Sequence, residues 1–163
     1  MKTLYLVRHA KSSWKYDLPD HQRPLKNRGF SDAELVSKHV KSEYKAPQKI
    51  VSSDAKRAQT TARYFQKAFD VKDQDFVLDH DLYDFSGQSV MEIIKGLDDD
   101  LKRVMIVGHN HAFTSIVNML GSEYIDNLPT SGFVIIEFDT DSWSDITTGK
   151  TKALVFPRHL KAK

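Results

Sequence analysis

The chain has no cysteine among its 163 residues, and it is poor in glycine and proline, with seven and five of them. The absence of cysteine excludes disulfides and thiol catalysis, and it is typical of proteins in a reducing compartment. With so few glycines and prolines, the sequence has no linker rich in these residues, and no internal repeat divides it. We therefore expect a single domain over residues 1–163, long enough to bury a substantial core.

Long apolar runs and an excess of one charge are also missing. No apolar stretch approaches the length of a membrane-spanning helix, so we expect no association with a membrane. A strand pattern begins already at Leu4, without an apolar signal segment before it, and we expect a cytoplasmic location. There are 24 Lys and Arg against 22 Asp and Glu, and this net charge of +2 gives no sign of nucleic-acid binding.

The spacing of apolar residues predicts alternating strands and helices. Strands are expected at 3–8, 49–52, 76–78 and 103–108, and helices at 31–44, 54–69, 89–97 and 111–121. Ser89, followed three residues later by Glu92, is typical of a capping box at a helix start. Segments 132–138 and 152–156 are expected to form a C-terminal hairpin at the sheet edge. This alternation predicts a three-layer αβα fold with a mainly parallel, open sheet.

Arg8 and His9 lie where the first expected strand ends. In an open α/β sheet, ligands collect outside the carboxyl ends of the strands. A neutral imidazole can attack phosphorus there while a guanidinium binds the phosphoryl oxygens. The pair therefore indicates phosphate chemistry, and a solvated strand end is the ordinary alternative for an isolated Arg-His dipeptide.

Lys56 and Arg57 fall in the first turn of the helix that follows strand 49–52, and Ser53 or Asp54 is expected to cap this helix. Cations at a helix start oppose the helix dipole, typically by about 0.3–1 kcal/mol. Their presence calls for a bound anion or a nearby carboxylate. Phosphate is one explanation, and pairing of Arg57 with Asp54 is the other.

His109 follows the strand that ends at Gly108. The glycine allows a close approach of the backbone, and the free amides of the next helix suit phosphate oxygens. His109 and His111 would share a face and bind a metal only if both lay on a strand. On a helix start they diverge, and no third ligand with suitable spacing is evident, so we expect no metal site.

Six segments spread over most of the chain carry a family resemblance. They are Leu6–Trp14, Arg23–Leu25, Arg28-Gly29, Ser52–Thr60, Leu82-Tyr83 and Val107–Asn110. In this order they resemble the SixA-type branch of the histidine phosphatase superfamily, which has the phosphoglycerate-mutase-like fold. The resemblance implies that His9 is the phosphorylated nucleophile and that Arg8, Arg57 and His109 complete a phosphate pocket. No metal or organic cofactor is then needed, because arginine and histidine cations take the role that magnesium has in other phosphotransfer sites.

An acid that protonates a leaving group is not clearly provided. Acid-phosphatase relatives carry an aspartate directly after the second histidine, where this chain has Asn110. The nearest other candidates are Asp79, Asp81 and Asp84, of which Asp84 is preferred because it follows a Leu-Tyr pair. A weakly provided acid favours a substrate with an easy leaving group, such as phosphohistidine.

The sequence therefore predicts a protein phosphohistidine phosphatase, a monomer or weak oligomer with an open pocket. Its partner would be a phosphorylated protein, for example a histidine-containing phosphotransfer domain. Two alternatives stay open: a small-molecule phosphomonoesterase or mutase that uses a mid-chain aspartate as its acid, and a non-catalytic phospho-ligand binding module. Trp14 and Tyr16 could form a docking surface for a protein, but loop aromatics more often pin their loop to the domain, and we favour that interpretation.

Overall fold

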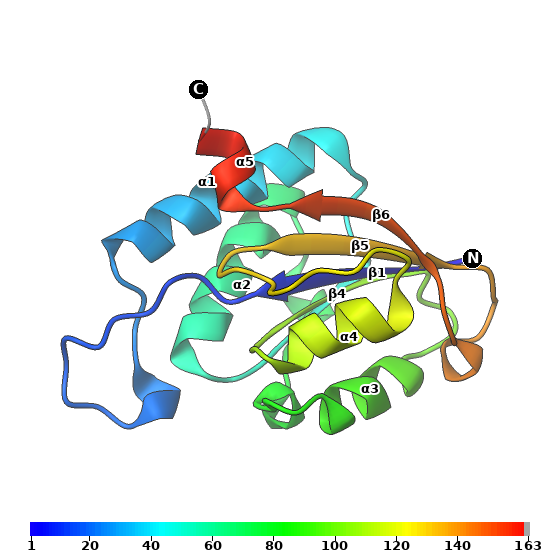
Figure 1. Ribbon diagram of the computed structural model, residues 1–163, viewed down its shortest axis with the longest axis horizontal. Helices are drawn as coiled ribbons and strands as arrows, with labels where there is room; N and C mark the ends of the chain where they lie inside the picture. The colour runs from blue at the N-terminus through cyan, green and yellow to red at the C-terminus, as the bar shows by residue number, and fades with distance from the viewer. Residues whose placement is uncertain (162–163) are drawn as a thin grey trace.

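A six-stranded sheet forms the middle layer of the computed structural model, which describes residues 1–161 (Figure 1). Its strand order is β3-β2-β4-β1-β5-β6. The bounds are β1 (Lys2–Arg8), β2 (Lys49–Ser52), β3 (Phe76–Leu78), β4 (Arg103–Gly108), β5 (Phe133–Phe138) and β6 (Lys150–Val155). The first four strands are parallel, whereas β5 pairs antiparallel with both β1 and β6. The expected α/β fold, with its hairpin at the sheet edge, is confirmed.

Helices cover both faces of the sheet (Figure 1). They are α1 (Asn27–Glu43), α2 (Lys56–Phe69), α3 (Gln88–Lys95), α4 (Ala112–Leu120) and α5 (Pro157–Lys161). The connections contain the short 3₁₀ turns η1 (Asp20–Gln22), η2 (Asp73–Asp75), η3 (His80–Leu82) and η4 (Trp143–Asp145). No helix in the described part of the chain is both long and apolar enough to cross a bilayer.

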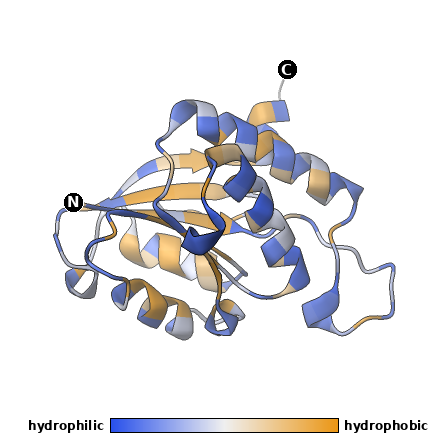
Figure 2. Ribbon diagram, turned by 180° about the vertical axis from the view of Figure 1, so that it is seen from behind, coloured by the Kyte–Doolittle hydropathy of each residue, from blue (hydrophilic) through white to orange (hydrophobic). Residues whose placement is uncertain are grey.

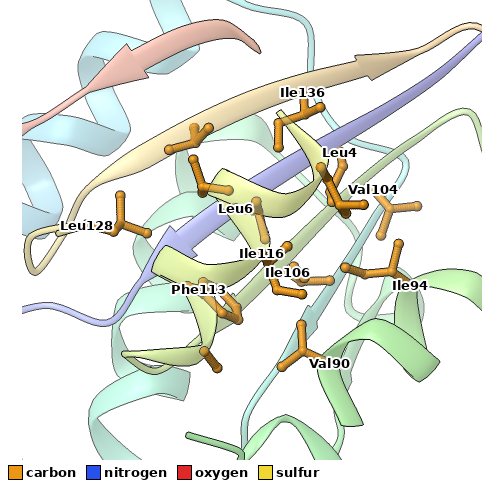
Figure 3. Close-up of a cluster of buried hydrophobic side chains, with 14 of the residues drawn as sticks. Leu4, Leu6, Val90, Ile94, Val104, Ile106, Phe113, Ile116, Leu128 and Ile136 are labelled. Carbon is orange, nitrogen blue, oxygen red and sulfur yellow. The ribbon is translucent and has the colours of Figure 1, made fainter. Parts of the chain in front are cut away.

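The central strand β1 shows why the sheet is buried on both sides. Successive side chains of a strand point to opposite faces. Leu4 and Leu6 pack in the cluster beneath α3 and α4, whereas Tyr5 and Val7 pack in the cluster beneath α1 and α2. Figure 3 shows the first cluster, and Figure 2 shows the apolar strands inside a shell of more polar helix surfaces. An uninterrupted apolar run is what a doubly covered strand requires.

Two expected helix caps are wrong, and the helix expected from residue 31 begins four residues earlier, at Asn27. The helix after β2 has Ala55 at its N-cap with no side-chain cap, because the hydroxyl of Ser53 and the carboxylate of Asp54 make other contacts. The helix expected from Ser89 begins at Gln88, and the carboxylate of Asp84 accepts hydrogen bonds from its first turn in place of a capping box. Both caps were predicted from residues close to the helix start in the sequence, whereas the folded chain gives these side chains and amides other hydrogen-bond partners.

The strand register brings the predicted site residues to one edge. Arg8 at the end of β1 pairs with Gly108 at the end of β4, and Ser52 at the end of β2 pairs with Val107. The next residue after each strand end therefore lies in one row, in which the amide of His9 donates to the carbonyl of Gly108 at 3.0 Å.

Candidate active site

A cavity of about 300 Å³ opens at the carboxyl edge of β1 and β4. Its lining includes Arg8, His9, Asp20, Arg23 and Arg57. Three of these residues were predicted from the sequence to line a phosphate pocket, and His109 lies directly beside them, with its ring centroid 5.2 Å from that of His9. The predicted residues thus form one cluster, although His9 and His109 are a hundred residues apart in the sequence.

The imidazole of His9 is held in one tautomer. Its Nδ1 lies 2.7 Å from the carbonyl oxygen of Ala10. A carbonyl can only accept a hydrogen bond, so Nδ1 carries the proton and Nε2 keeps its lone pair. His9 is buried. An oriented, unprotonated Nε2 in a cavity lined by guanidinium groups is suited to nucleophilic attack on phosphorus.

The surroundings also keep His9 neutral. Burial lowers its pKa well below the ordinary value, and the guanidinium charges of Arg57 and Arg8 lower it further. The hydrogen bond to the Ala10 carbonyl works in the opposite direction but is outweighed. The sequence had suggested the two arginines as the cause; they contribute, but burial is the larger effect.

His109 is completely buried behind His9. Its Nε2 lies 2.8 Å from the hydroxyl oxygen of Ser53, which follows the neighbouring strand β2. Burial and the Arg57 charge lower its pKa to about 3, so that both imidazoles are uncharged at neutral pH. The Nδ1 atom has no hydrogen-bond partner among residues 1–161. The partnership with Ser53 was not predicted, because the expected role of that residue was to cap a helix.

Arg57 is paired with a carboxylate that the sequence did not point to. Its Nη1 donates to the backbone carbonyl of Asp20 at 2.6 Å, and its Nη2 donates to the side-chain carboxylate at 2.9 Å. The alternative partner Asp54 is therefore wrong. Asp20 lies in η1, far from Arg57 in the sequence and without any distinguishing spacing.

Asp20 is held by two further side chains. Tyr83 donates its hydroxyl to the carboxylate at 2.5 Å, and Arg23 donates from Nε at 3.1 Å. Partial burial would raise the pKa of Asp20, but the hydrogen bonds from Tyr83 and Arg57 and the arginine charge hold it well below its usual range. A permanent negative charge thus stands beside Arg57 in the cavity. It orients the guanidinium, and an incoming anion must compete with it.

Arg8 keeps most of its donors available. Among residues 1–161 it makes one side-chain hydrogen bond, from Nη1 to the carbonyl of Leu128 at 2.8 Å. A guanidinium has five N–H donors, so Arg8 can still bind an oxyanion in the cavity that it lines. Ser131 stabilises this strand end: its amide lies 3.0 Å from the carbonyl of Arg8 and 3.2 Å from that of His9. Its φ of 62° lies in the left-handed region, which a serine adopts only under such constraint.

Asp84, the acid preferred from the sequence, has a structural role in the folded protein. Its carboxylate accepts hydrogen bonds from the amides of Ser86, Gly87 and Val90 at 3.0–3.2 Å. These bonds outweigh its partial burial and lower its pKa, whereas a general acid at neutral pH needs a raised one. Asp79 is similarly used, as its carboxylate accepts from the amide of Asp81 in η3 at 2.9 Å. The geometry therefore speaks against Asp79 and Asp84 as general acids.

The segment after β4 differs from the expected anion site. The side chain of Asn110 accepts from the amide of Thr114, and the carbonyl of His109 accepts from that of Phe113, so these helix-start amides are already bonded. At Gly108 a Cβ atom would lie 2.8 Å from the Phe113 ring, so the glycine is needed for packing. His111 is exposed while His109 is buried, and the two do not converge on a metal.

Two exposed aromatic residues, Trp14 and Phe85, line the cavity, and we refer to them as its rim. Trp14 is 78% exposed, and its ring lies against the guanidinium of Arg23, with 3.5 Å between Cζ and the ring centroid. Phe85, between η3 and α3, is 46% exposed, and it lines the same cavity. Tyr16 is also more than half exposed. The expectation that Trp14 and Tyr16 pin their loop to the core is therefore wrong.

Comparison with known proteins shows the family and the fold. Residues 4–105 match the family model of the histidine phosphatase superfamily (branch 1). An uncharacterized chloroplastic protein of Arabidopsis thaliana is 31% identical over 88% of this chain and 70% of its own length. A protein of Agrobacterium tumefaciens, whose crystal structure is assigned to a phosphohistidine phosphatase SixA, is 25% identical to this chain. The two structures superpose with a TM-score of 0.82 over 96% of this chain and 98% of that one. A phosphoserine phosphatase of Entamoeba histolytica, solved with 3-phosphoglyceric acid, shares the fold at 16% identity, with a TM-score of 0.66 over 98% and 100% of the two chains.

Proposed function

Because this chain belongs to the histidine phosphatase superfamily and is a phosphatase, we propose that it hydrolyses phosphohistidine on proteins through a phosphorylated His9. The observation that carries the proposal is the state of His9. It is neutral, its Nδ1 proton is bonded to Ala10, and its Nε2 is free beside the guanidinium groups of Arg8 and Arg57. A module that only binds phosphate has no use for an oriented nucleophile.

The reaction proceeds in two in-line transfers. In the first, the lone pair of His9 Nε2 attacks phosphorus, the bond from phosphorus to the substrate nitrogen breaks, and the departing imidazole keeps that electron pair and takes a proton from solvent. In the second, water attacks the phosphorylated His9. Inorganic phosphate leaves, and the neutral imidazole is restored.

The cationic residues of the pocket stabilise the charge that is spread over the phosphoryl oxygens in each transfer. Arg8 and Arg57 supply fixed positive charge at the cavity, and Arg8, which makes a single side-chain hydrogen bond among residues 1–161, can bind two oxygens at once. His109 is uncharged in the resting pocket. A bound phosphoryl dianion would raise the pKa of His109, which is then able to donate a hydrogen bond to it.

The substrate class follows from the leaving group. An alkoxide needs a proton donor, and the carboxylates of Asp79 and Asp84 are both engaged by backbone amides. Asp20 lines the cavity, but its low pKa makes it a poor acid at neutral pH. The phosphoramidate bond of phosphohistidine breaks more readily than a phosphate monoester, and it fits a site in which none of these three carboxylates is suited to act as a general acid.

The rim supports a protein as the carrier of the phosphoryl group. Trp14 and Phe85 are large, exposed and apolar, and they stand at the mouth of a cavity whose floor is charged. Exposed aromatics of this kind are enriched where proteins bind one another. We propose a cytoplasmic signalling protein with a phosphorylated histidine, such as a histidine-containing phosphotransfer domain, as the partner.

The test compares the wild type with His9→Asn on a phosphohistidine-bearing protein, on free phosphoramidate and on a panel of phosphate monoesters. We expect turnover of phosphohistidine that falls by at least about a thousandfold in the variant, as for other removed nucleophiles. Rapid quenching should also trap acid-labile phosphate on the wild type and none on the variant. His111→Asn, which changes an exposed histidine near the pocket, is the matched control.

Two outcomes would redirect the assignment. Turnover of monoesters in preference to phosphohistidine would identify a small-molecule phosphatase on the same pocket. Turnover that survives in His9→Asn would contradict the nucleophile itself.

A further inference from the structure

Outside the phosphate pocket, His21, Asp54 and His80 form a second cluster of side chains that can bind metal ions. They come from η1, from the loop between β2 and α2, and from η3. One imidazole nitrogen of each histidine and a carboxylate oxygen of Asp54 lie within 4.8 Å of one another. We propose that this cluster is a binding site for a divalent transition-metal ion, with Zn²⁺ as its best match.

The donor atoms already converge. His21 Nε2 lies 2.7 Å from Asp54 Oδ1, and His80 Nδ1 lies 3.0 Å from both carboxylate oxygens. Bonds of about 2.0–2.2 Å to a tetrahedral ion separate its ligand atoms by roughly 3.4 Å. Admission of an ion therefore needs the His21 and His80 nitrogens to move away from the carboxylate by roughly 0.7 and 0.4 Å.

The donor set also suits the ion. Two imidazoles and one carboxylate are a common three-ligand set for zinc, and they leave a fourth position for water. All three side chains are partly open to solvent, with 36%, 31% and 69% exposure for His21, Asp54 and His80. His21 and Asp54 also border a surface cavity, which gives the ion a route to the site.

Neighbouring groups hold the ligands in place. Both imidazoles pack against the ring of Tyr83, at centroid distances of 5.0 and 5.7 Å. The backbone carbonyl of Asp54 accepts a hydrogen bond from the side chain of Gln59 at 2.8 Å. Such outer contacts orient metal ligands and reduce the cost of ordering them.

This site is separate from the chemical step of the proposed phosphatase. It lies next to the pocket, because His21 follows Asp20 in η1 and Asp54 follows Ser53 in the chain. A bound ion would link η1 to η3, the two turns that supply Asp20 and precede Tyr83. It would thus fasten the part of the rim that carries the carboxylate partner of Arg57.

The test is titration of the tag-free, chelator-treated protein with Zn²⁺ by calorimetry, and with Co²⁺ by visible absorption. We expect one ion per chain and a cobalt spectrum with the intensity of a four-coordinate site. His21→Ala and His80→Ala should each weaken binding by at least about tenfold, since loss of an outer-shell partner alone often does so. His39→Ala, on α1, is the matched control and should bind as the wild type does.

Other results would overturn the proposal. No binding at micromolar zinc would show that the cluster is only a pair of histidine–aspartate contacts. Binding that is unchanged in both cluster variants but lost in His9→Asn would place the ion in the phosphate pocket. Neither result depends on turnover, so the metal site can fail while the phosphatase assignment holds.

Discussion

The floor and the rim of the pocket are built in opposite ways. His9, Arg57 and His109 on the floor are buried and fixed by backbone or side-chain partners. Trp14 and Phe85 on the rim are exposed and lie on loops. A floor of this kind recognises the phosphoryl group, which all substrates share. A rim of this kind recognises the molecule that carries the phosphoryl group. Substitutions in the floor and in the rim should therefore affect phosphoryl transfer and carrier recognition separately.

After the nucleophile His9, the largest effect is expected from Arg57→Ala, which removes a cation from the floor. Loss of one group that stabilises transition-state charge typically lowers turnover by about 10²–10³-fold. We expect this loss in kcat/KM for the phosphorylated protein and for free phosphoramidate alike. The adjacent exposed cation provides the control, as Lys56→Ala should change neither rate appreciably. An effect confined to the protein substrate would assign Arg57 to the rim.

The buried imidazoles of the floor should make stability depend on pH. The pKa of His109 is about 3 in the folded protein, against about 6.5 in the unfolded chain. Because the folded pKa is the lower one, the stabilisation is complete above about pH 6.5 and is lost as the pH falls toward 3. The free energy of unfolding should drop by up to about 1.4 kcal/mol per pH unit for such a group.

Urea unfolding at about pH 7, 6 and 5 measures this loss. His109→Gln, which cannot take up the proton, should show a shallower pH dependence than the wild type. His111→Gln replaces an exposed histidine and should leave the dependence unchanged. Identical slopes for all three proteins would contradict the neutral, buried state of His109.

The Asp20 carboxylate links the floor to the rim, and its charge opposes the binding of anions. Asp20→Asn keeps the shape of the side chain and removes that charge from beside Arg57. Inorganic phosphate should then inhibit more strongly, by about fivefold. This corresponds to only a small part of the Coulomb energy between Asp20 and Arg57, whose charged atoms are 2.9 Å apart. Asp17→Asn on the same loop is the control. Weaker inhibition would mean that Asp20 aids phosphate binding by orienting Arg57 more than it hinders binding by competing for the guanidinium.

The effect expected at the rim is confined to one kind of substrate. Trp14→Ala should raise the KM for the phosphorylated protein by about three- to tenfold, in the range of interface truncations. Free phosphoramidate, which is too small to reach beyond the floor, should be turned over within about twofold of the wild-type rate, and stability should change by less than about 0.5 kcal/mol. Tyr124 is as exposed as Trp14 but does not line the cavity, and Tyr124→Ala should alter neither substrate. Equal losses on both substrates would show that Trp14 supports the floor through Arg23.

The site residues that could be predicted are those attached to strand ends. Arg8, His9 and His109 follow apolar runs, and the register of parallel strands places such positions side by side without further information. Arg57 was predicted from an electrostatic anomaly at a helix start. Its carboxylate partner Asp20 could not be predicted, because the fold of a long loop brings η1 to the pocket. The contacts of Asp84 with the first turn of α3 could not be predicted for a similar reason, because they form only in the folded chain.

Local physics explains what the sequence by itself determined: the order of strands and helices, the parallel sheet, and the basic and imidazole groups at its carboxyl edge. Each of these follows from the period of apolar residues and from the chemistry of side chains next to them. The tertiary structure decided the protonation states, the partners of the charged groups and the exposure of Trp14. Burial and long-range contacts set these properties, and neither can be read from neighbours in the chain. The convergence of His21, Asp54 and His80 likewise depends on three segments that meet only in the folded protein.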